Sequence, residues 1–209
     1  MDLVYEEKQH RGYTCKVLYD QDPISPDDWD TIGKIYSGHR EHNPQNHKID
    51  EIIDWDEDGK WHINKDYIFV YIHFYEHSGL TIWSSRKMPD GYGWDSGFFG
   101  LYAVHKDNAT KEFGDLSNEE NYERLMKCLE VEVEAWDMYY RGEVYGYEVY
   151  EEDGSFIDSC WGFYGEPEEV MKEAISIADY EADEKERKAA EEAARVELYE
   201  RICEPFWID

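Results

Sequence analysis

Three aspartates at alternate positions form the spacing that most closely matches a metal site. Asp54, Asp56 and Asp58, followed by Gly59, fit the first half of an EF-hand loop, whose alternate oxygens wrap around a hard cation. The twelfth position of such a loop supplies a bidentate Glu, and here it is Lys65. The flanking residues also have the pattern of strands. An acidic hairpin tip is therefore the main interpretation, and weak Ca²⁺ binding at the three aspartates is the only cofactor that we consider.

One loop is dense in histidine. His39, His42 and His47 lie within nine residues of one another. On a loop this spacing could supply two zinc ligands, but the sequence shows no H-E-x-x-H helix and no third ligand at a set spacing. We do not predict a metal site there from the sequence.

A row of polar aromatic side chains follows one predicted strand. Tyr71, His73, Tyr75 and His77 project to one face because side chains alternate along a strand. Such a row could line a pocket, although more often it packs with its polar atoms satisfied. A small enzyme or ligand-binding protein that uses the face of His73 and His77 is our alternative hypothesis for function.

Several motifs of nucleophilic catalysis and nucleotide binding are missing from the sequence. There is no G-x-S-x-G, P-loop or G-x-G-x-x-G pattern, and the four cysteines form no C-x-x-C pair. We therefore expect that the protein is not an enzyme. The amino terminus has no apolar signal region and no stretch is long enough to span a membrane, so we expect a cytoplasmic protein without a membrane partner.

Negative charge is the dominant chemical feature. Fifty Asp and Glu stand against 21 Lys and Arg, a formal net charge of −29 on 209 residues. The acids are spread over the chain: residues 20–66 carry 13 acids and five bases, residues 115–158 carry 14 and three, and residues 166–204 carry 14 and six. Such a surface repels nucleic acid and attracts basic partners. Solubility alone is the simpler explanation, but the 16% aromatic content is high for a chain adapted only to salt.

Alternating and β-branched stretches predict a sheet rich in hairpins. Strands are expected at residues 12–19, 52–55, 60–63, 67–75, 80–83, 98–104, 144–150 and 156–163. Asp58-Gly59 and Asp153-Gly154 predict type I′ hairpin turns. Ser25-Pro26 predicts the start of a short helix through Trp29, Ile32 and Ile35 that stops near Gly38.

Two long helices follow from the periodicity. Ser117-Asn118-Glu119-Glu120 predicts a capping box for a helix over residues 117–140, and Pro167 predicts the start of a helix that runs to about Ile202. The apolar stripe of the first comprises Tyr122, Leu125, Met126, Leu129, Val133, Trp136 and Tyr140. The second has few large apolar residues beyond Glu181 and should project, with Phe206-Trp207-Ile208 as an aromatic end. The expected fold class is α+β, an antiparallel sheet packed by an amphipathic helix, with a globular domain at residues 1–165 and the long acidic helix at residues 166–209.

The outward faces of these helices are the predicted partner-binding surface. Their carboxylates are Glu120, Glu123, Glu130, Glu134 and Asp137 on the first helix, and Glu181, Asp183, Glu184, Glu191 and Glu192 on the second. Carboxylates in rows can stand in for phosphates and pair with the Lys and Arg side chains of a partner.

Several stretches within residues 12–165 are similar to sequences of a known protein family. They are Ser25-Pro26 through Trp29-Asp30, His39-Arg40, His77-Ser78-Gly79, Trp94-Asp95-Ser96-Gly97, Glu143-Val144-Tyr145-Gly146-Tyr147 and Asp158-Ser159-Cys160-Trp161-Gly162-Phe163-Tyr164-Gly165. Together they resemble a family of acidic, largely uncharacterised proteins of bacteriophages and bacterial integrative elements. The resemblance implies a small protein that acts in the host cytoplasm, and acidic proteins of this context resemble DNA mimics.

Charge and resemblance lead to one functional hypothesis. We expect an anti-restriction or anti-CRISPR type of protein that inhibits a DNA- or RNA-binding nuclease complex of the host by mimicking nucleic acid. Its partner would be the basic nucleic-acid-binding surface of that complex, with no direct contact to nucleic acid. A further alternative is an acidic phage protein that regulates a host protein, and the sequence leaves open whether the chain forms a homodimer.

Overall fold

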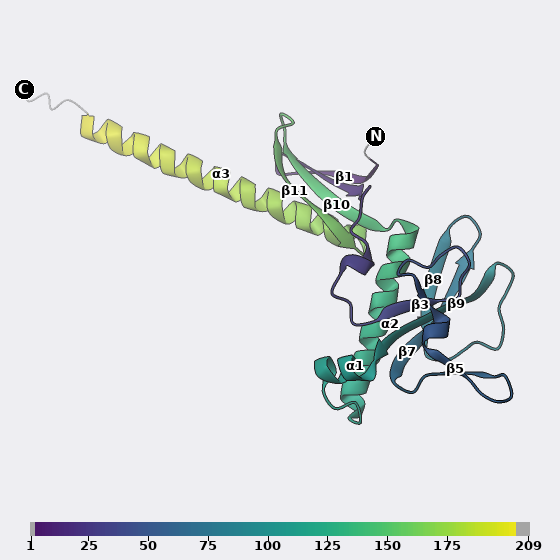
Figure 1. Cartoon of the computed structure of the whole chain (residues 1–209). Coiled ribbons are helices and arrows are strands. Elements are labelled where there is room, and N and C mark those ends of the chain that lie inside the picture. Colours follow the sequence, from purple (N-terminus) through teal and green to yellow (C-terminus); the bar gives the residue numbers. More distant parts are fainter. Residues whose placement is uncertain (1–2, 204–209) are drawn as a thin grey trace, which may run out of the picture. The chain divides into compact units, whose positions relative to one another are not determined.

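The computed structural model describes residues 3–203, which divide into two compact units (Figure 1). Unit 1 combines the chain up to Gln21 with the chain from Val144 onward, and unit 2 is Asp22–Glu143. The expected division at residue 165 differs from this arrangement, because the terminal helix packs against the sheet of unit 1 and does not separate from it. The predicted aromatic end at residues 206–208 lies outside the described residues. No helix within residues 3–203 combines the length and the apolar character needed to cross a membrane.

Unit 1 is a four-stranded antiparallel sheet with one long helix. The strands are β1 (Val4–His10), β2 (Tyr13–Tyr19), β10 (Val144–Glu151) and β11 (Phe156–Tyr164), in the order β1-β2-β10-β11. The helix is α3 (Pro167–Cys203). In Figure 1 this green-to-yellow helix crosses the sheet and continues beyond it. The sheet therefore joins strands from both ends of the chain.

The core of unit 1 lies between this sheet and the first half of α3. Alternate residues of β2 and β10 face the helix, and their buried members are Tyr13, Cys15, Val17, Tyr145, Tyr147 and Val149. They pack against Val170, Met171, Ala174, Ala178 and Ala182 of α3. Ala182 is the last buried residue of the helix. The second half of α3 is therefore outside the core, as the sequence predicts.

Unit 2 is built on a five-stranded sheet. Its strands are β3 (Lys34–Ser37), β4 (His47–Lys48), β7 (Tyr67–Glu76), β8 (Leu80–Ser85) and β9 (Ser96–His105), in the order β4-β3-β9-β7-β8. All neighbours are antiparallel except β3 and β4. A separate hairpin is formed by β5 (Ile53–Trp55) and β6 (Trp61–Ile63). Residues 26–28 and 49–51 form single 3-10 turns.

Two helices complete unit 2. They are α1 (Lys106–Phe113), which the sequence did not predict, and α2 (Glu119–Arg141). The predicted stripe of α2 is confirmed at Leu125, Met126, Leu129, Val133 and Trp136, which are all buried against the sheet. Gly142 ends the helix with φ +68°, as expected of a left-handed cap. The α+β fold class is therefore confirmed, with two antiparallel-rich sheets and a long carboxy-terminal helix.

The predicted helix from Ser25 to Gly38 is wrong. Ser25 does cap a turn, since its hydroxyl accepts the backbone N–H of Asp27, but the turn ends at Asp28. Ile35 lies in β3 and pairs with Tyr102 of β9. A glycine at position 33 weakens a helix, and a full set of ladder hydrogen bonds to a central strand outweighs one favourable cap.

Two local predictions also need correction. The cap of α2 is Asn118, whose side chain accepts the backbone N–H of Glu120, while the Ser117 hydroxyl bonds Asp115. The Asp-Gly turns of both hairpins have a positive φ at the glycine alone, so they are not type I′ turns. The turn with positive φ at both central residues is Arg11-Gly12, between β1 and β2.

Candidate basic-partner interface

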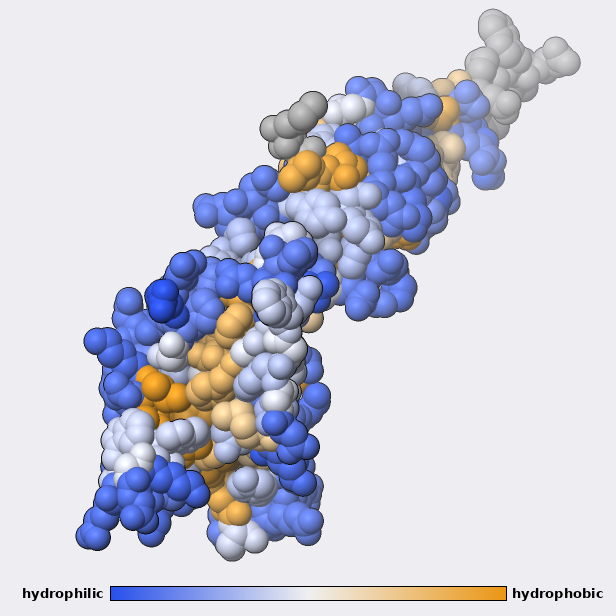
Figure 2. All heavy atoms as spheres, turned by 90° about the vertical axis from the view of Figure 1, so that its right-hand side faces the viewer, coloured by the Kyte–Doolittle hydropathy of each residue, from blue (hydrophilic) through white to orange (hydrophobic). Residues whose placement is uncertain are grey.

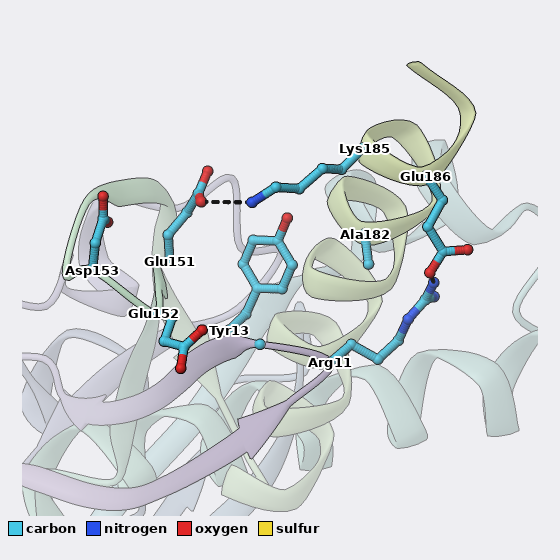
Figure 3. Close-up of a pocket in the computed structure, with 9 residues that line it drawn as sticks. Arg11, Tyr13, Glu151, Glu152, Asp153, Ala182, Lys185 and Glu186 are labelled. Atoms are coloured by element: carbon cyan, nitrogen blue, oxygen red, sulfur yellow. Dashed lines mark hydrogen bonds and ion pairs between the residues drawn. The ribbon is translucent and has the colours of Figure 1, made fainter. Parts of the chain in front are cut away.

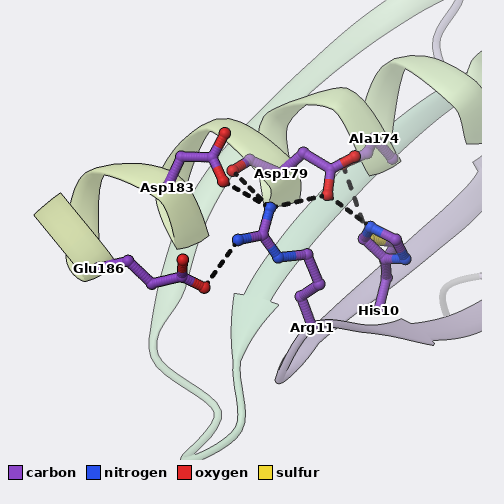
Figure 4. Close-up of polar contacts among 7 residues, drawn as sticks. His10, Arg11, Ala174, Asp179, Asp183 and Glu186 are labelled. Atoms are coloured by element: carbon purple, nitrogen blue, oxygen red, sulfur yellow. Dashed lines mark hydrogen bonds and ion pairs between the residues drawn. The ribbon is translucent and has the colours of Figure 1, made fainter.

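The Arg11 side chain joins the first hairpin of unit 1 to α3 (Figure 4). Its guanidinium lies 2.7 Å from Asp183, 2.8 Å from Glu186 and 3.2 Å from Asp179. These three carboxylates raise the pKa of Arg11, Asp183 most of all. A hydrogen bond from His10 and then one from Arg11 lower the pKa of Asp179. One cation therefore serves three acids, and the face of unit 1 around it keeps a net negative charge.

A groove opens beside this ion cluster (Figure 3). It has a volume of about 560 Å³ and lies between the β1–β2 turn, the β10–β11 turn and α3. The residues that line it are Arg11, Gly12, Tyr13, Glu151, Glu152, Asp153, Ala182, Lys185 and Glu186. Both cations in this set are already paired, because Arg11 bonds Glu186 and Lys185 lies 2.9 Å from Glu151.

The remaining acids of the groove come from the β10–β11 turn. The backbone N–H of Ser155 bonds Asp153 and is the main cause that lowers the pKa of that carboxyl. Glu152 is exposed, and among the described residues no cation lies within ion-pair distance of it. Tyr13 also lines the groove, but it is only 4% exposed and belongs to the core of unit 1. An acidic recess suits the side chain of a partner's Lys or Arg, which gains ion pairing.

The predicted carboxylates of α3 lie along the helix but do not share one environment. Asp183 pairs with Arg11 in the cluster described above. Glu184 and Glu191 both pair with Arg187 at 2.7 Å, and Glu192 pairs with Arg195 at 2.9 Å. Glu181 is half-buried. Four of the five predicted carboxylates are therefore engaged by cations of their own unit.

Charge is distributed unevenly along α3. Residues 166–183 carry seven acids and one base, whereas residues 184–203 carry six acids and five bases. The exposed second half is thus almost neutral and is held together by pairs at spacings of three and four. The negative surface of unit 1 lies mainly on the first half of α3 and on the β10–β11 turn. The sequence analysis predicted this surface further along α3.

Four of the five predicted carboxylates of α2, all except Asp137, lie on the solvent side of unit 2. Arg86, which directly follows β8, lies 2.7 Å from both Glu123 and Glu130. Glu134 lies 3.9 Å from Lys127. Glu120 is exposed near the start of the helix. The ridge that the spacing predicts exists, but Arg86 neutralises part of it.

Two acids of α2 support the fold instead of facing a partner. Asp137 accepts the backbone N–H of Ile82 at 2.8 Å and pairs with Arg141 at 3.3 Å. Glu132, which the sequence did not single out, accepts the backbone N–H groups of Ile32 and Gly33 at 2.9 and 3.1 Å. A carboxylate on a helix gives no sequence signal for such a role, because its partners are backbone groups 99 and 100 residues away.

The three aspartates of the calcium-like motif lie at the β5–β6 hairpin. Asp54 of β5 lies opposite His62 of β6 in the strand register, and Asp58 lies in the exposed turn. Asp56 accepts the backbone N–H groups of Asp58 and Lys60 and lies 2.7 Å from His62. Asp56 thus supports the turn, as the hairpin interpretation requires, and Ca²⁺ binding stays a prediction.

Tyr71, His73 and Tyr75 of the predicted polar aromatic row alternate along β7, whereas His77 follows the last residue of the strand. His73 is buried, its Nε2 lies 2.7 Å from the Ser85 hydroxyl and its Nδ1 lies 2.8 Å from the Tyr92 hydroxyl. The Ser85 hydroxyl donates to the carbonyl oxygen of Lys87, so it accepts the Nε2–H of His73. The Tyr92 hydroxyl lies within hydrogen-bond distance of both Nδ1 and the Met88 sulfur, so both ring nitrogens of His73 have a partner. His77 is exposed and lies 3.4 Å from Asp95.

The sheet of unit 2 has a second apolar face, opposite α2. Its residues are Ile52, Leu101 and Ala103, with the partly buried Tyr36, Ile49, Ile63, Tyr67, Phe69, Tyr71 and Phe98. Figure 2 shows hydrophobic side chains gathered in a band on unit 2 between hydrophilic flanks. Trp83 lies opposite His73 on β8 and is 42% exposed. Aromatic centres with a charged rim are typical of surfaces that bind proteins.

Comparison of this chain with protein families, with curated proteins and with solved structures finds no match. The functional argument therefore rests on the residues and their geometry.

Proposed function

We propose that this protein is a phage or mobile-element anti-defence protein, which inhibits a nuclease complex of the host by occupying its nucleic-acid-binding surface. The inhibitor would carry no catalytic step. Its carboxylates would take the places of phosphates and pair with the Lys and Arg side chains that otherwise hold DNA or RNA.

The acidic groove of unit 1 is the observation that carries the proposal. Its two cations are committed to acids of the same unit, so Glu152 and Asp153 remain for a partner. The charge of the whole chain also supports a basic partner. A net charge of −29 attracts a basic protein and repels nucleic acid.

Fixed geometry also supports the proposal. The groove is built from two strand turns and a helix that Arg11 links to the sheet, so the backbone that carries its carboxylates is held in place before a partner arrives. A pre-formed charged surface loses less conformational entropy on binding than a disordered acidic segment does.

The test combines salt, DNA and a matched pair of variants. The tagged protein is used to isolate its partner from a bacterial host, and binding of the isolated partner is then titrated with duplex DNA present at increasing concentration. We expect DNA to compete with the protein and the affinity to fall steeply with salt. Salt-independent binding, or a ternary complex of partner, protein and DNA, contradicts the proposal.

The groove itself is tested by two charge-matched double variants. Glu152→Gln with Asp153→Asn removes two charges from the groove, and Glu197→Gln with Glu200→Gln removes two from the exposed second half of α3. We expect the groove variant to lose about tenfold in affinity, or about 1.4 kcal/mol, and the α3 variant to lose little. Equal losses would mean that only total charge matters.

A further inference from the structure

The loop after β3 brings a histidine to the end of β7. His42 Nε2 lies 3.3 Å from Glu76 Oε1, and the carboxylate of Glu41 belongs to the same group, whose ligand atoms all lie within 4.8 Å of one another. Glu76 is 34 residues from His42 in the sequence. The histidine-rich segment therefore gains a third metal-ligating side chain from a distant strand, which the sequence pattern could not show.

The loop is held in place by a buried serine. The Ser37 hydroxyl accepts the backbone N–H of His39 at 2.9 Å and lies 3.0 Å from the carbonyl oxygen of His42 and 3.1 Å from that of Phe99. Ser37 is 4% exposed. The backbone of residues 39–42 is thus attached to the end of the sheet on which Glu76 also lies.

His39 supports the loop and is not a ligand. Its ring stacks on Phe99 with centroids 5.4 Å apart and meets the edge of Phe74 at 4.6 Å. Its Nδ1 accepts the backbone N–H groups of Glu41 and His42 at 3.3 and 3.1 Å. In a neutral imidazole whose Nδ1 accepts hydrogen bonds, the proton lies on Nε2, so no lone pair is left for a metal.

His42 and Glu76 form a direct contact, and the spacing of the two atoms also suits two ligands of one metal ion. Charge-assisted N–H···O bonds are about 2.7–2.9 Å long. Two ligands that are each about 2.0–2.1 Å from a tetrahedral zinc ion lie about 3.3 Å apart, as these two atoms do. Glu41 is exposed and can rotate to complete a third contact.

We propose that Glu41, His42 and Glu76 bind one divalent transition-metal ion of the zinc class. One imidazole and two carboxylates suit such an ion, whereas Ca²⁺ takes only oxygen ligands. Two carboxylates neutralise the charge of the ion. Three protein ligands leave a fourth position for water or for a donor from a partner, and the site lies on the surface of unit 2.

The proposal is tested with zinc chloride and chelator-treated protein. Calorimetric titration of the full chain should show one zinc ion per chain, and Co²⁺ in its place should give the visible absorption of a four-coordinate site. His42→Gln and Glu76→Gln should each weaken zinc binding by at least about tenfold. Both side chains are at the surface, and circular dichroism checks that the variants fold.

A second histidine–carboxylate pair of unit 2 provides the matched control. His77 lies 3.4 Å from Asp95, and within residues 3–203 this pair has no third ligand, so His77→Gln should bind zinc as the parent protein does. Absence of zinc binding overturns the proposal, as does an equal loss in His77→Gln. Zinc binding that Asp54→Asn removes and His42→Gln does not would place the metal at the β5–β6 hairpin and would also overturn it.

Discussion

The guanidinium of Arg11 and the carboxylate of Asp183 are 2.7 Å apart, although 172 residues separate them in the chain. Arg11 has φ +49°, a conformation that residues other than glycine rarely adopt. The turn that carries Arg11 is therefore held in a less favourable backbone conformation while its side chain bonds α3.

Replacing Arg11 separates these two effects. Arg11→Gly removes the ion pairs and suits the positive φ, so we expect the melting temperature to fall by a few degrees at low salt, and by less in 1 M NaCl, because salt screens the lost pairs. Lys8→Ala removes the same charge from an exposed pair with Glu6 and should change little. A higher melting temperature for Arg11→Gly would show that backbone strain outweighs the ion pairs.

Two acids of α2 should differ in what they do for stability. Glu132→Ala leaves the backbone N–H groups of Ile32 and Gly33 without their acceptor, and we expect it to lower the free energy of unfolding by about 2–4 kcal/mol. Glu120→Ala removes an exposed acid from the same helix and should change it by less than about 0.5 kcal/mol. Urea denaturation measures both. Similar losses would mean that Glu132 has no special role.

His73 should make unit 2 less stable in mild acid. Burial lowers the pKa of His73, so the unfolded chain takes up a proton near the ordinary value of about 6.5 before the folded chain does. Stability is therefore full above that pH and is lost as the pH falls through it, by at most about 1.4 kcal/mol per pH unit for one proton. Denaturation curves from about pH 7.5 to about pH 5.5 measure the slope.

His73→Phe is the control for this pH dependence. The variant should be less stable at every pH, because Ser85 and Tyr92 lose a hydrogen-bond partner, but its stability should vary less with pH in this range. An unchanged slope would assign the acid sensitivity to other groups.

The second half of α3 should be dispensable for the core of unit 1. Ala190 is exposed and follows the last buried residue of the helix, so Ala190→Pro should reduce the helical circular dichroism while leaving the cooperative unfolding of unit 1 unchanged. Ala178→Pro breaks the buried half and should abolish that transition. A lower melting temperature for Ala190→Pro would show that the exposed half contributes to the fold.

The sequence predicted correctly those elements whose defining residues are close together in the chain. The stripe of α2, the glycine after it and the start of α3 at Pro167 all lie close to the residues that they define. β1 was missed because its acidic, exposed sequence has no apolar alternation, and only its pairing with β2 makes it a strand. Ile35 was assigned to a helix because its pairing partner, Tyr102, is far away in the sequence.

The candidate sites also depend on residues that are far apart in the sequence. The sequence predicted an acidic surface and named ten carboxylates, but charge counts do not show which acids already have a partner. Arg86 reaches Glu123 and Glu130, and Arg187 bridges Glu184 and Glu191, so several predicted residues are neutralised within the chain. Glu152 and Asp153 stand out only once the β10–β11 turn is placed beside α3.

The composition of unit 1 from both ends of the chain has a consequence for biosynthesis. The strands and helices of unit 2 lie within residues 22–143, so that unit can close while the ribosome is still adding the remainder. The β1–β2 hairpin must wait for β10 and α3, which are made after unit 2. Until then the apolar side of β2 has no cover, and the acidic groove does not exist. The proposed partner-binding surface would form only after α3 leaves the ribosome.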